Sequence, residues 1–323
     1  MEAWRNFVKG NWNEQIDVKN FIDLNYTPYI DGPEFLKGPT DRTKRVSKRL
    51  NDLLRQEMEK GGVLDIDTHT VSTVLAFDPG YVIKEDDIIV GLQTDAPLKR
   101  AISPFAGFRM SEQACKAYGY EIGENIRDEF KYRTTHNTAV FKAYTDDMKK
   151  ARHCGILTGL PDAYGRGRII GDYRRIALYG MDYLMEQKRQ DKAELGKNLM
   201  DETNIHLIED VAKQLDFMQA LKEQAIKYGY DISQPATNAK EAIQWLYFGY
   251  LGAVKEQNGA ANSIGRITTF LDIYIQRDIQ EGTLDEEHAQ ELIDDLVVKL
   301  RLVRHLRTPE YNELFAGDPT WVT

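Results

Sequence analysis

The sequence has little cysteine and little histidine, two and six residues respectively among 323. Two cysteines, Cys115 and Cys154, are too few for the disulfide framework of a small secreted domain, and their spacing is not that of a metal site. The histidines follow no ligand pattern either, so we expect no metal site. Such cysteine usage is typical of a reducing compartment, which predicts a cytoplasmic protein.

Long apolar runs and an excess of basic charge are also missing. The most apolar stretch, residues 242–254, is too short to span a bilayer and contains Gln244. Residues 1–15 have neither the basic nor the apolar region of a signal peptide. A net charge of −9 argues against a general nucleic-acid-binding protein. The composition is that of a soluble globular protein, for which we expect neither a membrane nor a nucleic acid as partner.

The organisation along the chain is that of one domain over residues 1–323, without internal repeats or low-complexity segments. Residues 1–60 form a helical N-terminal segment of short helices joined by turns. The piece at residues 26–41, with three prolines and two glycines, is the most linker-like. β-branched residues in 71–83 and 87–94 predict strand or partly extended structure.

The second half of the chain is strongly helical. Residues 203–229 place five apolar side chains on one stripe, as an amphipathic helix does. That stripe consists of Ile208, Val211, Leu215, Met218 and Leu221. Residues 237–259 begin with cap-type residues, have Glu241 three positions after Asn238, and are apolar nearly all round, which predicts a buried helix.

A third helix is expected over residues 283–307. It opens with a capping box from Thr283 to Glu286, and Pro309 closes it. Acidic residues crowd its first half and basic residues its last turns, which matches the helix macrodipole. Its expected core residues are Leu292, Leu296, Leu300 and Val303.

A glycine-rich segment in the middle of the chain, TGLPDAYGRGRIIGDYRR at residues 158–175, holds four arginines. The glycine spacing does not fit a dinucleotide-binding fingerprint, whose third glycine would fall at Ile170. Glycine instead lets the backbone approach a ligand closely. Arg166 and Arg168, two residues apart, fall on the same face of an extended segment. The two isoleucines that follow favour Arg168 as the side chain inside an enclosed site. There its planar fork suits a carboxylate.

The end of this segment predicts a helix, with Asp172 as its N-cap. Arg174 and Arg175 then lie in the first turn, where the macrodipole disfavours cations by roughly 0.3–1 kcal/mol each. We therefore expect both arginines to be paired with acidic groups or with an anion, and structural ion pairs are the simpler expectation.

Long stretches of the chain closely resemble the glycyl-radical enzyme family of pyruvate formate-lyase, or formate C-acetyltransferase. The matching stretches, in order, are NYTPY (25–29), GLQTDAPLKRA (91–101), RTTHN (133–137), TGLPDAYGRGRIIGDYRR (158–175), KYGYDISQPATNAKEAIQW (227–245), QNGAANSIGR (257–266) and LRTPEYNELFAGDPTW (306–321).

The resemblance implies an α/β fold, helix-rich, in which this chain forms half of a ten-stranded α/β barrel and the complete protein is a homodimer. It also implies the reaction: radical cleavage of pyruvate to formate and an acetyl-enzyme, followed by acetyl transfer to coenzyme A. That chemistry belongs to anaerobic fermentation and is switched on by a radical-activating enzyme.

Carried over residue by residue, the resemblance makes Arg168 the arginine that holds the pyruvate carboxylate. Ala260 matches a position that lines the site, where a larger side chain would crowd the substrate. Phe315 and Trp321 match aromatic residues that wall the pocket and exclude water. The resemblance also implies a docking surface for coenzyme A, which acts as a co-substrate. Its residues are Phe141, Arg152, His153 and Tyr164.

Two elements of the family's chemistry do not occur in these 323 residues. The adjacent Cys-Cys pair is missing, and so is the R-V-S-G-Y loop that stores the glycyl radical. We expect an N-terminal portion that binds no cofactor, contains no catalytic residue and is inactive by itself. Two alternatives stay open: a paralogue acting on 2-oxobutyrate, and a non-catalytic binding or assembly subunit completed by a separate C-terminal chain.

Overall fold

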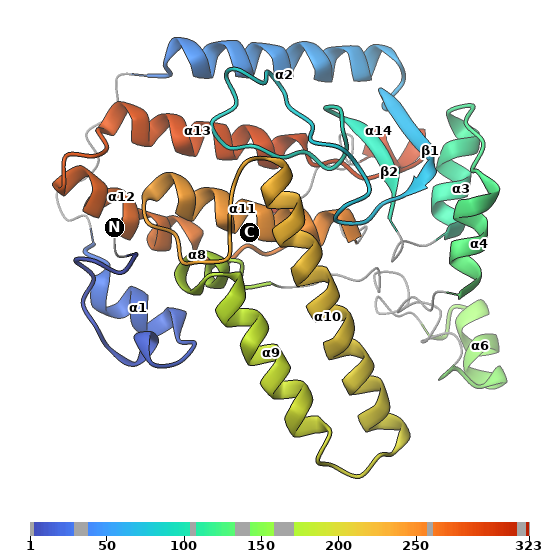
Figure 1. Cartoon of the computed structure of the whole chain (residues 1–323). Helices are drawn as coiled ribbons and strands as arrows, with labels where there is room; N and C mark the ends of the chain where they lie inside the picture. The colour runs from blue at the N-terminus through green and yellow to red at the C-terminus, as the bar shows by residue number, and fades with distance from the viewer. Residues whose placement is uncertain are drawn as a thin grey trace.

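A computed structural model describes residues 3–28, 38–103, 108–132, 143–157, 171–256, 261–314 and 321–322. The fold is helix-rich (Figure 1). Its helices are η1 (Asn11–Asn13), α1 (Val18–Asn25), α2 (Asp41–Glu59), α3 (Phe108–Ala117), α4 (Glu124–Tyr132), α6 (Asp146–His153), α8 (Arg174–Tyr179), α9 (Met181–Leu195), α10 (Glu202–Lys227), α11 (Ala239–Glu256), α12 (Ile267–Gln280), α13 (Glu286–Leu302) and α14 (Pro309–Leu314). Among the described helices, none has both the length and the apolarity needed to cross a bilayer.

The described strands form two parallel pairs. Strand β1 (Asp65–Val71) pairs with β2 (Lys99–Ile102), and β3 (Ala261–Asn262) pairs with β4 (Trp321–Val322). Parallel pairing within a mainly helical fold agrees with the α/β class expected from the sequence. Within residues 3–28 and 38–60 the structure has the helices η1, α1 and α2, of which α2, at 19 residues, is long.

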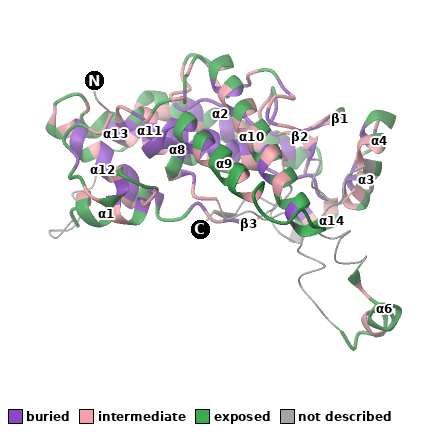
Figure 2. Ribbon diagram, turned by 60° about the horizontal axis from the view of Figure 1, so that its bottom comes forward, coloured by how far each residue is buried: buried purple, intermediate pink, exposed green. Residues whose placement is uncertain are grey.

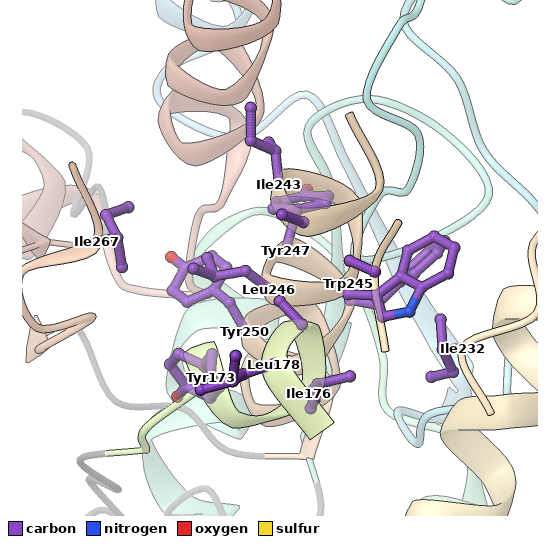
Figure 3. Packing of buried hydrophobic residues seen from close by; sticks show 14 of the residues in the cluster. Tyr173, Ile176, Leu178, Ile232, Ile243, Trp245, Leu246, Tyr247, Tyr250 and Ile267 are labelled. Carbon is purple, nitrogen blue, oxygen red and sulfur yellow. The ribbon is translucent and has the colours of Figure 1, made fainter. Parts of the chain in front are cut away.

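Helix α11 is the centre of the core. Fourteen of its 18 residues are buried, so the expectation of a helix that is apolar on all sides is confirmed. It packs against α8, α10, α12 and α13, and Figure 3 shows its aromatic side chains between those neighbours. The expected cap is also present, because Asn238 Oδ1 accepts a hydrogen bond from the Glu241 amide at 2.9 Å. The helix thereby carries the chain from Asn238 to the edge of the QNGAA turn.

Helices α9 and α10 form a hairpin that projects from this core (Figure 1). The stripe expected on α10 is confirmed in part. Val211 and Leu221 are buried, and Leu215 and Met218 are partly buried against the main cluster. Helix α10 packs mainly against α9. Much of its remaining surface is exposed.

Strand or partly extended structure was expected over residues 71–83 and 87–94, and of these residues only Val71 lies in a strand. Side chains from distant helices take the backbone groups that a neighbouring strand would otherwise bind. Asp295 accepts from the Ile89 amide at 2.7 Å. Gln244 bonds both the amide and the carbonyl of Val90, at 2.7 and 2.9 Å. The segment is therefore buried as an extended loop rather than as a strand.

Helix α13 begins three residues later than expected. Its N-cap is Asp285, whose side chain accepts from the His288 amide, and not Thr283. The Thr283 hydroxyl instead donates to the Asp278 carbonyl at 3.1 Å. The helix ends at Leu302, so Pro309 does not close it but opens α14. The expected core residues are confirmed: Leu292, Leu296 and Val303 are buried, and Leu300 is packed against the same cluster.

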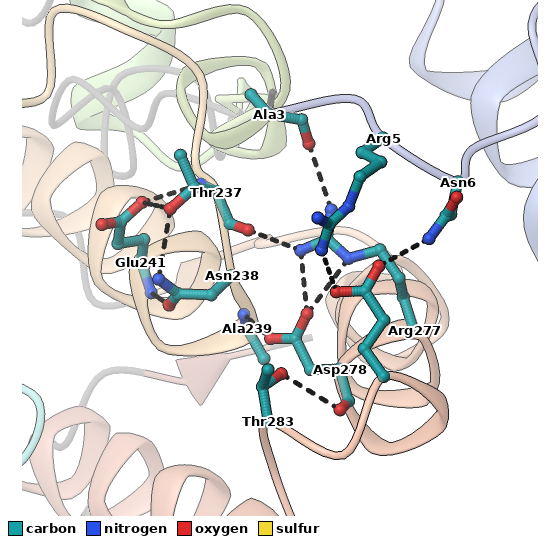
Figure 4. Close-up of polar contacts among 11 residues, drawn as sticks. Ala3, Arg5, Asn6, Thr237, Asn238, Ala239, Glu241, Arg277, Asp278 and Thr283 are labelled. Atoms are coloured by element: carbon teal, nitrogen blue, oxygen red, sulfur yellow. Dashed lines mark hydrogen bonds and ion pairs between the residues drawn. The ribbon is translucent and has the colours of Figure 1, made fainter. Parts of the chain in front are cut away.

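A buried ion pair ties the N-terminal segment to the core (Figure 4). Arg277 Nη2 lies 2.9 Å from Asp278 Oδ1, and the same guanidinium donates to the carbonyls of Ala3 and Thr237. Asp278 Oδ2 accepts from the Ala239 amide at 2.6 Å, at the start of α11. One pair of adjacent residues on α12 thus fixes both the chain start and the central helix.

Candidate functional site

The described part of the arginine-rich segment begins at Gly171. Arg166 and Arg168, the carboxylate-binding candidates, lie outside the described residues, as do Tyr164 and the glycines around them. Arg174 forms a fork with Asp172, with Nε–Oδ1 and Nη2–Oδ2 distances of 2.7 and 3.1 Å. Arg175 Nε lies 3.7 Å from the same carboxylate. The expectation that Arg174 and Arg175 make structural ion pairs is confirmed.

The expected N-cap role of Asp172 is wrong. The N-cap of α8 is Tyr173, and no side chain caps the helix. Asp172 cannot cap because its carboxylate is held by the guanidinium groups of Arg174 and Arg175. The single helix expected after residue 172 is broken at Gly180, whose φ of 76° suits glycine. A Cβ there would lie 2.5 Å from the Gln234 carbonyl carbon, so the close approach of that chain also requires glycine.

The QNGAA turn, which carries the site candidate Ala260, is flanked by α11 and β3. Residues 257–260 lie outside the described residues, but both flanks are placed. Strand β3 pairs with β4 so that Ala261 is opposite Trp321 and Asn262 opposite Val322. The backbone after Ala260 therefore lies beside the backbone of Trp321. Phe315, the other pocket-wall candidate, lies outside the described residues.

The start of α8 contacts the segment that follows β3. A Cβ at Gly265 would lie 3.8 Å from the guanidinium carbon of Arg174. Three stretches that are distant in the sequence therefore meet: the end of the arginine-rich segment, the segment after the QNGAA turn, and β4. The resemblance predicts that these stretches share a site, but the sequence alone does not show which of their residues touch.

Helix α8 is also locked onto α11 at a glycine. A Cβ at Gly249 would lie 2.6 Å from Cδ1 of Ile176 and 3.2 Å from Cδ1 of Tyr173, so a larger residue there would displace these side chains. The Tyr173 ring meets Tyr250 edge-on, with ring centroids 6.0 Å apart. Burial raises the pKa of Tyr173 to about 12. The phenol therefore stays protonated and can act as a hydrogen-bond donor.

Strand β3 carries an enclosed polar side chain that the sequence did not mark. Asn262 is 1% exposed, and neither its amide nitrogen nor its amide oxygen has a hydrogen-bond partner among the described residues. Buried amides are normally bonded. The Asn262 side chain therefore offers a ligand both a hydrogen-bond donor, its amide nitrogen, and an acceptor, its amide oxygen.

The expected coenzyme A surface is described only in part. Arg152 and His153 lie in the last turn of α6, where Arg152 is partly buried and His153 is exposed. Phe141 and Tyr164 lie outside the described residues. Helix α6 lies apart from the other helices in Figures 1 and 2. Arg152 and His153 are therefore not brought to the β3–β4 pair by any described contact.

The two cysteines lie in different environments. Cys115 is buried on α3 and Cys154 is exposed after α6, and both are free. Burial raises the pKa of the Cys115 thiol to about 11. A thiol in that state is a weak nucleophile near neutral pH. Within the described ranges, no cluster of three or more histidine, cysteine, aspartate or glutamate residues could hold a metal ion.

Solved structures of glycyl-radical enzymes share this fold. Hydroxyproline dehydratase from Clostridioides difficile matches 84% of this chain and 41% of its own, with a TM-score of 0.56 and 18% identity. The glycerol dehydratase from Clostridium butyricum matches 87% of this chain and 42% of its own, with a TM-score of 0.58 and 16% identity. The helix-rich fold thus matches about two-fifths of each of these chains.

Comparison of the amino-acid sequence identifies the family of this chain. The family model described as pyruvate formate lyase-like matches residues 11–323, so the chain belongs to the pyruvate formate lyase-like family. It is 53% identical, over 99% of its length, to the formate acetyltransferase of Haemophilus influenzae. The chain covers 42% of that relative, corresponding to its N-terminal portion.

Proposed function

We propose that this chain is the N-terminal part of a formate C-acetyltransferase, which converts pyruvate and coenzyme A to acetyl-CoA and formate. The observation that carries the proposal is the 53% identity to a formate acetyltransferase over almost the whole chain. In this assignment residues 1–323 form one half of the ten-stranded barrel as a single domain. The complete enzyme is a cytoplasmic homodimer.

The role of this chain is to bind and orient the substrate. Arg168 holds the pyruvate carboxylate through two parallel hydrogen bonds, which a planar guanidinium provides and an ammonium does not. Ala260 leaves room for the substrate, and Phe315 and Trp321 exclude water. The pairing of Ala261 with Trp321 supports this arrangement, because it brings two of the three segments together. The approach of Arg174 to Gly265 places the third segment, the end of the arginine-rich stretch, beside them.

Coenzyme A docks with its nucleotide end against Phe141, Arg152, His153 and Tyr164, where aromatic faces suit the adenine and basic groups the phosphates. When present, the Cys-Cys pair and the glycyl radical supply bond cleavage and acetyl transfer, and an activating enzyme generates the radical. Neither the adjacent Cys-Cys pair nor the R-V-S-G-Y loop with its radical glycine occurs in this sequence. The chain alone therefore binds substrate without turnover.

The test measures formate release from pyruvate and coenzyme A under strictly anaerobic conditions. The chain alone should give no formate above a blank. Combined with an activated polypeptide that carries the Cys-Cys pair and the R-V-S-G-Y loop, it should give formate and acetyl-CoA. Formate production by the chain alone, or its absence from the activated combination, would contradict the proposal. Running 2-oxobutyrate beside pyruvate separates the two substrate classes.

A further inference from the structure

Two carboxylates and one ammonium group are buried together where residues 82–91 meet α11 and α13. Lys299 Nζ lies 2.6 Å from Asp87 Oδ2, and neither side chain is exposed. Asp295, one turn before Lys299 on α13, is 5% exposed and has no ion pair among the described residues. Its Oδ2 accepts a hydrogen bond from the Ile89 amide at 2.7 Å. The single ammonium group therefore pairs directly with one carboxylate and leaves the other with backbone partners.

The other groups around Asp295 supply no further positive charge. Glu291, one turn earlier on α13, is itself acidic and is held by the Thr40 hydroxyl and by Arg42. On α11, burial keeps the pKa of Tyr247 well above its ordinary value, so its phenol stays neutral. A buried carboxylate without a direct counter-ion is costly to ionise. Accordingly, burial raises the pKa of Asp295 from 3.8 to about 6.

The same carboxyl group helps to hold residues 82–91 in place. This segment lies in no strand, so its backbone is bound by side chains of α11 and α13. Gln244 bonds the amide and the carbonyl of Val90, and Asp295 bonds the amide of Ile89. When the segment moves away, the Asp295 carboxyl meets water and its pKa returns toward the ordinary value. Binding of a proton is therefore coupled to closure of the segment.

We propose that Asp295 is a proton-dependent switch that sets how tightly residues 82–91 are attached to α11 and α13. With a proton on the carboxyl group the attachment is tight, and after the proton is lost the buried charge favours opening. The stabilisation is thus present at low pH and is lost as the pH rises through about 6. Because the segment leads directly toward β2, the switch acts on the chain just before the β1–β2 pair. It does not depend on the assignment of a substrate.

Hydrogen exchange measured by mass spectrometry on the full-length protein, at pH 5 and pH 7, tests the switch. The readout is the protection factor of peptides covering residues 82–94, which removes the intrinsic pH dependence of exchange. With a pKa of 3.8 in the open state and about 6 in the closed state, the opening equilibrium should rise about tenfold from pH 5 to pH 7. Asp295→Asn keeps an oxygen for the Ile89 amide but cannot ionise, so its protection should not fall over this range.

Asp294→Asn is the matched control, because it removes a carboxylate one residue away that is not fully buried. His288→Gln removes an exposed imidazole of α13 that pairs with Asp285. Both variants should keep the change of about tenfold. Equal protection at the two pH values in the unsubstituted protein overturns the proposal, and so does a change that persists in Asp295→Asn.

A pH series on the unsubstituted protein decides the question if Asp295→Asn does not fold. Protection of residues 82–94 should fall from about pH 4.5 and become constant above about pH 7. Protection that stays constant over the whole series overturns the proposal.

Discussion

Ala261 and Trp321 are register partners in two adjacent parallel strands. The residues come from the QNGAA turn and from the C-terminal segment, which the sequence analysis placed in one site by resemblance alone. Their pairing gives that grouping a physical basis, because backbone hydrogen bonds between parallel strands fix the separation of the two segments. These two segments are therefore joined by long-range strand pairing rather than by a single loop.

Replacing Arg168 by lysine should impair pyruvate binding in the activated, complete enzyme. An ammonium cannot reproduce two parallel hydrogen bonds to a carboxylate, so we expect the KM of pyruvate to rise at least about tenfold. The KM of coenzyme A should change little. Arg189→Lys is the control, because Arg189 makes only an exposed pair with Glu186. Steady-state kinetics with each substrate varied in turn gives the answer, and an unchanged pyruvate KM would remove Arg168 from the site.

Asp295→Asn should stabilise the fold at neutral pH. Burial raises the pKa of Asp295 from 3.8 to about 6. A carboxyl group with a raised folded-state pKa stabilises the fold at low pH, and that contribution is lost as the pH rises through about 6. The variant should gain about 1–3 kcal/mol at pH 7 and little at pH 4. Urea unfolding at both pH values measures this, and equal gains at the two values would contradict it.

Two buried lysines should respond in opposite ways to replacement by methionine. Lys255 is 1% exposed. Its Nζ lies 3.5 Å from the Val74 carbonyl oxygen and 5.9 Å from the centroid of the Phe77 ring. Burial lowers its pKa from 10.5 to about 8. The folded state therefore gains stability as the pH rises from about 8 to 10.5, and Lys255→Met should add about 1–3 kcal/mol at pH 7.

Lys299 is the matched counterpart, because its Nζ lies 2.6 Å from Asp87 Oδ2 and both side chains are fully buried. Lys299→Met leaves that carboxylate without its counter-ion and should cost about 3–5 kcal/mol. Denaturant unfolding of the two variants at pH 7 compares them. A loss of stability in Lys255→Met would show that its ammonium is compensated in the folded state.

Asp278→Ala should detach the N-terminal segment from the core. The substitution removes the partner of Arg277 and the acceptor of the Ala239 amide. Since it leaves a buried guanidinium without its carboxylate, it should cost about 3–5 kcal/mol. Asp272→Ala on the exposed face of α12 is the control, for which we expect a change within about 0.5 kcal/mol. Hydrogen exchange of residues 3–28 should accelerate in the first variant and not in the second.

The helices were the part of the fold most readily predicted. The bounds expected for α10 and the core residues of α13 agree with the structure, because apolar periodicity and capping act within a few residues of sequence. Errors arose where a distant side chain displaced a local one. Thr283 has the residue type of a cap, but its hydroxyl bonds the Asp278 carbonyl, and Asp285 caps α13 instead.

Residues 87–94 show that a local sequence pattern does not reveal which distant side chains will bind the backbone. Their β-branched side chains favour a strand, yet Gln244 on α11 and Asp295 on α13 bind the backbone of Val90 and Ile89. Which partner a buried amide finds depends on helices far away in the sequence. Tyr173 is a similar case, since its packing against Gly249 joins segments that are far apart in the sequence.

By itself the sequence determined the family, the helical segments and the residue types that suit a carboxylate, because these depend on local order and on side-chain chemistry. Only the tertiary structure decided that Arg174 and Arg175 bind Asp172, that β3 lies beside β4, and that the buried Tyr173 hydroxyl has no hydrogen-bond partner among the residues that the structure describes. Those relationships are set by contacts between segments, and the free energy of burying or pairing a group depends on what surrounds it in space.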